Sequence, residues 1–174
     1  MIFVCAGHHV KAPGASYKGF NEYDEACLWS KLIVDYIGND AVLVPNGVIK
    51  DKVQFINDRD PVDSIAVEIH FNSAKDDQGT PIGEGAETLY YPDSVKGRVI
   101  ATKVQAALAG LFRDRGVKEG WYRMQKRFGP DYFLARTKCP AIIIEPDFIH
   151  RREYIQTRRE QACRAIANAL HSRI

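Results

Sequence analysis

The stretch IFVCAGHHVKAPGA, residues 2–15, joins a run of apolar residues to a glycine, two histidines and a Pro-Gly pair. Apolar residues 2–5 are typical of a buried strand, because the run is short and ends at a glycine-containing turn. Similar runs, rich in β-branched residues and bounded by Gly, Pro, Asn or Asp, predict further strands at residues 41–44, 65–69, 88–91 and 141–144.

Helical patterns lie between these predicted strands. They cover about residues 22–37, 94–114 and 153–174, with Asn21 as a helix cap and Gly38 just after the first helix. Strands that alternate with helices indicate an α/β fold. We therefore expect a single domain, residues 1–174, with a mostly parallel or mixed twisted sheet of about five to six strands and helices on both faces. Residues 114–138 are expected to form a surface loop over a cleft.

Composition narrows the class of protein. The chain has 174 residues, 45% of them hydrophobic and 26% charged, which is typical of a soluble globular domain. A net charge of only +2 argues against a dedicated nucleic-acid binder. The four cysteines form no CxxC pair, so free thiols are expected. Neither a signal peptide nor an apolar run long enough for a membrane span is evident, so we expect synthesis in the cytoplasm.

Three ionisable residues follow predicted strands. His8 comes after the first, His70 ends SIAVEIH, and Glu145 ends PAIIIE. In an open α/β sheet, ligands bind outside the carboxyl ends of the strands. Any one of these residues could simply form hydrogen bonds within the fold at the sheet edge. Three of them at corresponding strand ends indicate a functional site.

A carboxylate at the start of the first predicted helix is a further candidate. Glu22 occupies the first helical turn and Glu25 follows one turn later, and the helix dipole alone would favour both. Two imidazoles and one carboxylate suit a catalytic zinc ion, which keeps its fourth position for water. Another carboxylate nearby would supply the general base.

The order AGHH, PGA, NE, EIHFNSA, GAETLYY, RG and PAIIIEPDFI resembles the zinc-dependent N-acetylmuramoyl-L-alanine amidases of the type 3 family, found in bacterial autolysins and phage endolysins. The resemblance extends from the first strand to about Arg152. It implies that His8, Glu22 and His70 bind Zn²⁺ and that Glu145 is the catalytic carboxylate. The implied substrate is the bond between N-acetylmuramic acid and L-alanine in peptidoglycan.

The sequence departs from the family pattern at two places. GHHV stands where the family often has GHGG, and we interpret His9 as a loop residue. Glu68 replaces a small residue and shares a strand face with His70, so it either orients His70 or bonds within the sheet. The pattern at the helix start fits best with Glu22 as ligand, and a shift of one turn would nominate Glu25.

Substrate contacts are predicted at two further positions. Asn72 follows His70 as in the family and would fix substrate amides or merely a turn. Arg123 belongs to a group with Trp121, Tyr122 and Lys126 that would line the cleft or form a packed loop with exposed charges.

The resemblance thus predicts a peptidoglycan hydrolase that degrades the cell wall. A lone catalytic domain without a signal peptide favours a phage-type endolysin, released through a holin for host cell lysis and antimicrobial in effect. The alternatives are a zinc peptidase acting within a cell-wall peptide and a non-catalytic wall-binding or regulatory domain of the same fold. Oligomeric state is left open.

Overall fold

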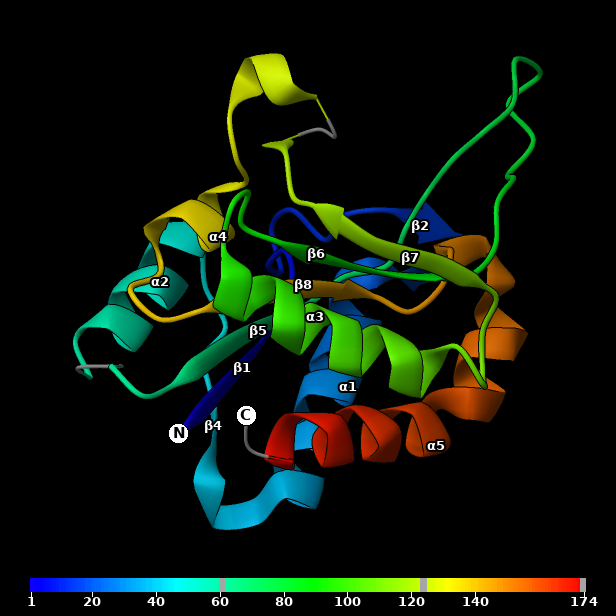
Figure 1. Ribbon diagram of the computed structural model, residues 1–174. Coiled ribbons are helices and arrows are strands. Elements are labelled where there is room, and N and C mark those ends of the chain that lie inside the picture. The colour runs from blue at the N-terminus through cyan, green and yellow to red at the C-terminus, as the bar shows by residue number, and fades with distance from the viewer. Residues whose placement is uncertain (60–61, 123–124, 173–174) are drawn as a thin grey trace.

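A six-stranded mixed sheet forms the centre of the computed structural model, which describes residues 1–59, 62–122 and 125–172 (Figure 1). The strand order is β4-β1-β5-β8-β6-β7. Neighbouring strands are parallel except β6 and β8, which are antiparallel. The mostly parallel or mixed sheet expected from the sequence is therefore confirmed. The strands are β1 Ile2–Ala6, β4 Ala41–Leu43, β5 Ile65–Ile69, β6 Ala86–Tyr90, β7 Asp114–Glu119 and β8 Ala141–Glu145.

Helices cover both faces of this sheet, as expected for an α/β domain. Alternation along β1 directs Val4 toward one core and Phe3 toward the other. The first core contains residues of three long helices, and the second contains residues of two shorter ones. The long helices are α1 Glu22–Ile37, α3 Val95–Leu108 and α5 Arg152–His171, and the shorter ones are α2 Ile49–Asn57 and α4 Tyr132–Arg136.

Two predictions for residues 94–138 were wrong. Helix α3 ends at Leu108, although the helical pattern predicted a helix over about residues 94–114. Residues 114–119, predicted to belong to a loop, form β7, which pairs in parallel with β6 at the edge of the sheet. The sequence DRGVKE has no apolar run because an edge strand keeps much of its surface in water, where charged side chains are favourable.

Two segments rise from the sheet at the top of Figure 1, residues 73–85 in green and residues 125–131 in yellow. The first contains an isolated bridge between Lys75 and Pro81. A short antiparallel pair, β2 Ser16–Tyr17 and β3 Phe20–Asn21, precedes α1.

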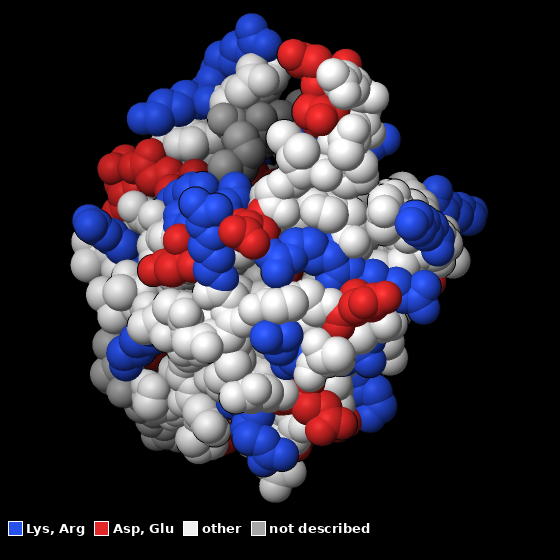
Figure 2. All heavy atoms as spheres, turned by 90° about the vertical axis from the view of Figure 1, so that its right-hand side faces the viewer, with Lys and Arg blue, Asp and Glu red and all other residues white. Residues whose placement is uncertain are grey.

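The surface shows mixed charge. On the face in Figure 2, Lys and Arg side chains are interspersed with Asp and Glu side chains, in keeping with the small net charge. Among residues 1–59, 62–122 and 125–172, no helix has the length and apolar character needed to cross a membrane.

Candidate metal centre

Three side chains converge beyond the carboxyl ends of β1 and β5. His8 Nε2 lies 3.1 Å from Glu22 Oε2, and His70 Nδ1 lies 2.9 Å from Glu22 Oε1. One ligand atom from each residue lies within 4.8 Å of the other two. The described part of the chain contains only this one such group of three or more His, Cys, Asp or Glu side chains. The structure therefore brings together the three residues nominated as metal ligands.

Two glycines allow this close approach. A Cβ at Gly7 would lie 2.5 Å from the His70 ring, and a Cβ at Gly14 would lie 2.5 Å from Glu22 Oε2. Gly7 is held next to the end of β5 by its N–H, which donates to the Ile69 carbonyl at 2.7 Å. Only a residue without a side chain fits at these two positions while the ligands stay where they are.

Helix α1 presents Glu22 to the site at its first residue. The carboxylate accepts hydrogen bonds from the backbone N–H groups of Ala15 and Phe71, both at 3.0 Å. Burial disfavours the charged form, but hydrogen bonds with His70 and His8 outweigh it and hold the pKa of Glu22 well below its usual range. Glu22 is therefore an anion at neutral pH.

Glu25 points elsewhere, which bears on the choice between the two carboxylates. Its oxygens accept two hydrogen bonds from Arg159, at 2.6 and 2.8 Å, and one from the Trp29 indole at 2.8 Å. Glu25 thus joins α1 to α5. It is Glu22, and not Glu25, that lies beside the two histidines.

Glu145 ends β8 next to the site. The backbone N–H of His70 donates to the Ile144 carbonyl at 2.9 Å, so the ends of β5 and β8 lie side by side. Burial raises the pKa of Glu145 to about 7, opposed by His70 and reinforced by the negative charges of Glu87 and Glu22. A carboxyl group with this pKa can both accept and release a proton near neutral pH.

Glu87 is a buried residue of this region that sequence reasoning missed. It lies directly opposite Glu145 in the antiparallel register and is only 1% exposed. Arg115 lies 3.1 Å from its carboxylate, and Lys118 forms a second ion pair with it. The Asn72 amide donates to Glu87 at 2.8 Å. Asn72 is thereby fixed next to the candidate site, and its contact with substrate stays a prediction.

The other nominated residues have different settings. Arg123 lies outside the described residues. The Trp121 indole donates to Glu119 at 3.2 Å, and the Lys126 ammonium lies 5.4 Å from the centre of the Trp121 ring. His9 pairs through its backbone with Ala12 and is not part of the metal-binding group.

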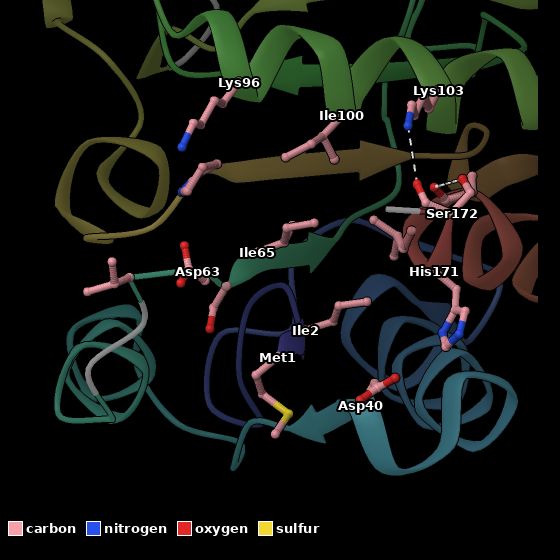
Figure 3. A pocket seen from close by; sticks show the side chains of 15 residues that line it. Met1, Ile2, Asp40, Asp63, Ile65, Lys96, Ile100, Lys103, His171 and Ser172 are labelled. Carbon is pink, nitrogen blue, oxygen red and sulfur yellow. Dashed lines mark hydrogen bonds between the residues drawn. The ribbon is translucent and has the colours of Figure 1, made fainter. Parts of the chain in front are cut away.

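A cavity lies away from the side chains of His8, Glu22 and His70. Its volume is about 730 Å³, and Figure 3 shows its lining residues, among them Ile2 and Ile65, where β1 and β5 begin. Ligands of α/β sheets bind at the opposite, carboxyl ends of strands. The chemistry of the side chains, and not cavity size, therefore identifies the candidate site.

The donor set fits a catalytic zinc ion. Zn²⁺ in enzymes is commonly held by three histidine or carboxylate ligands, with a further position open to water or substrate. His8 Nε2, His70 Nδ1 and the Glu22 carboxylate supply such a set.

Known proteins share the sequence pattern and the fold of this chain. Residues 2–172 match the model of the family described as N-acetylmuramoyl-L-alanine amidase. A comparison with curated protein sequences found no significant match. Similar solved structures include an N-acetylmuramoyl-L-alanine amidase from Clostridium difficile 630, with a TM-score of 0.80, 22% identity and coverage of 98% of this chain and 94% of the other.

Two further structures share the fold. For the amidase AmiC2 of Nostoc punctiforme the TM-score is 0.76 at 21% identity, with 98% and 94% of the two chains covered. For the catalytic domain of the CD27L endolysin, which targets Clostridia difficile, the TM-score is 0.71 at 21% identity, with 99% and 97% covered.

Proposed function

The chain belongs to the N-acetylmuramoyl-L-alanine amidase family, and from this premise we propose that it hydrolyses the amide between N-acetylmuramic acid and L-alanine with a Zn²⁺ ion held by His8, Glu22 and His70. Glu145 is the proposed catalytic acid and base. The observation that carries the proposal is the convergence of the two imidazoles on Glu22. Glu145, with a pKa of about 7, lies at the end of the neighbouring strand β8.

Each residue has a physical task in this reaction. Bound Zn²⁺ supplies Lewis acidity, which polarises the amide carbonyl and makes water a better nucleophile at neutral pH. His8 and His70 would hold the ion through their ring nitrogens, while the anionic Glu22 would offset one of its positive charges. Ionised Glu145 accepts the proton of the attacking water. It then returns the proton to the amide nitrogen, which leaves poorly as an unprotonated amine.

The environment of Glu145 supports its proposed role as a proton donor to the leaving amine. Burial favours its neutral form, and the opposing Glu87 adds to that effect. Glu87 itself forms ion pairs with Arg115 and Lys118. Glu145 is thus proposed to alternate between its two protonation states during turnover.

Product analysis tests the proposed reaction. Purified protein is incubated with peptidoglycan, with and without a chelator, and new L-alanine amino groups and reducing ends are counted. We expect metal-dependent release of L-alanine amino groups and no new reducing ends. Cleavage at another peptide bond would instead identify a zinc peptidase, and tight binding without cleavage would identify a non-catalytic wall-binding domain.

We also propose a biological setting, in which the chain is an endolysin that reaches the cell wall from the cytoplasm through a holin. Its support is the shared fold with the catalytic domain of the CD27L endolysin. Expression in a bacterial host with a matching wall tests this setting. Lysis is expected only when a holin is produced as well, and efficient lysis without a holin would contradict this release route.

A further inference from the structure

Lys52 of α2 is an unusual residue to find in a core. Its side chain is 1% exposed, and Lys is among the residues that are rarely buried completely. The ammonium donates to the carbonyls of Ala6 and His8, the latter at 2.8 Å, and to Glu68 Oε1 at 3.4 Å. Three N–H donors therefore have three acceptors.

Two of these acceptors belong to the segment that carries a proposed ligand. Ala6 ends β1, and His8 follows with a φ of 60°, in the left-handed region that residues other than glycine seldom adopt. A hydrogen bond to the His8 carbonyl holds this backbone conformation. Lys52 thereby fixes the direction from which the His8 ring enters the site.

The third acceptor leads to the other histidine. Glu68 is 3% exposed, and its second oxygen lies 3.2 Å from His70 Nε2, while His70 Nδ1 faces Glu22. A carboxylate on the far ring nitrogen of a histidine ligand fixes its tautomer and ring orientation. With Nε2 donating to Glu68, Nδ1 is free to present its lone pair to the metal.

We propose that the buried Lys52–Glu68 pair is a positioning device for the metal centre, with Lys52 fixing the His8 backbone and Glu68 fixing the His70 ring. The inference rests on the proposed function, because it assumes that His8 and His70 bind the metal. Both residues act through the histidines. They do not touch the ion or the substrate.

The energetics argue for such a role over a purely structural one. Burying two opposite charges costs desolvation that their attraction often fails to repay, so apolar residues would stabilise this part of the core at least as well. Glu68 lies on β5 beside Cys5 of β1, its register partner, and Lys52 donates to the carbonyls at the end of β1. The pair thereby reaches both proposed ligands at once.

Metal affinity is the direct test. Zn²⁺ affinity of the full chain is measured by competition with a chromogenic chelator for wild type, E68Q, K52M and K52M/E68Q. Loss of a hydrogen-bond partner behind a ligand typically lowers metal affinity about 10- to 100-fold, and we expect this loss in both single variants. K31M is the matched control, because Lys31 is an exposed lysine of α1 that pairs with Asp35.

A second measurement separates positioning from general damage to the fold. The visible spectrum of the Co²⁺-loaded protein reports ligand geometry, and we expect it to change in E68Q and K52M but not in K31M. The double variant should lose less affinity than the two single losses combined, because the residues act as one unit. If K52M fails to fold, E68Q and the double variant still decide the matter.

The outcomes also distinguish this inference from the proposed function. Folded E68Q with wild-type Zn²⁺ affinity and an unchanged Co²⁺ spectrum would overturn the positioning role, even if the wild type cleaves peptidoglycan. Wild-type protein that binds no Zn²⁺ would overturn the proposed function, and the inference with it.

Discussion

The contact between Glu25 and Arg159 yields a quantitative prediction about stability. Substituting Arg159→Met leaves the Glu25 carboxylate, which is 1% exposed, with only the Trp29 indole as a hydrogen-bond donor among its present partners. The substitution keeps most of the apolar stem of the side chain. It therefore removes mainly the two charge-assisted hydrogen bonds that join α1 to α5.

The magnitude follows from the burial of the two partners. Removing one member of a buried ion pair typically costs about 3 to 5 kcal/mol. The Arg159 side chain is 22% exposed, so water already screens part of the interaction. We therefore expect the lower end of this range, about 3 kcal/mol, which in a chain of this size lowers the melting temperature by about 6 to 12 °C.

Denaturant unfolding of the metal-free protein measures this change, with R98M as a control because Arg98 is an exposed residue of α3. The double variant E25Q/R159M should lose less stability than R159M alone, since no uncompensated charge is left buried. Zn²⁺ affinity of folded R159M should equal that of wild type. A loss of stability below about 1 kcal/mol, well under the range for a broken buried pair, would refute the energetic reasoning. Abolished Zn²⁺ binding in folded E25Q would refute the placement of Glu25 outside the site.

Four further predictions concern the site. Glu145→Gln should keep the fold and bound Zn²⁺ but slow the formation of new L-alanine amino groups about 10²- to 10⁴-fold. A wild-type rate in this variant would exclude Glu145 as the base. Because the pKa of Glu145 is about 7, the cleavage rate should rise with pH through 7, and a flat profile from pH 6 to 8 would contradict this role. The same raised pKa favours the neutral form of Glu145 in the folded state. The melting temperature of the metal-free wild type should therefore fall relative to that of Glu145→Gln as the pH rises from 4.5 through 7. Gly14→Ala should lower Zn²⁺ affinity, because the new Cβ would meet Glu22 and His8, whereas Gly19→Ala, with a similar positive φ but open space, should bind normally.

The fold was largely predictable because its central strands are buried on both faces. Runs such as residues 65–69 and 141–144 are mostly apolar, with Glu68 the one charged residue, and they form β5 and β8 almost as predicted. Edge strand β7 escaped prediction, since half-exposed charged residues replace the apolar pattern there. Short helix α4, of five residues, is held by tertiary contacts of Phe133 and Leu134 that no local pattern reveals.

Some residues of the candidate site were likewise predictable from the sequence, and others were not. His8, His70 and Glu145 each follow an apolar run, and this position in the sequence was enough to nominate them. Lys52 carries no comparable signal, because a lysine within a polar helical segment is expected to be exposed. Its burial depends on how α2 packs against the end of β1, more than 40 residues away in the sequence.

Zinc titration of the metal-free protein tests whether His8, Glu22 and His70 form a catalytic Zn²⁺ site. Metal is removed by chelation and dialysis, Zn²⁺ is returned in known amounts, and release of L-alanine amino groups from peptidoglycan is followed at each step. We expect no activity without metal and full activity at one Zn²⁺ per chain. The Glu22→Gln variant should require a far higher Zn²⁺ concentration for activity. Full activity of rigorously metal-free protein would contradict it.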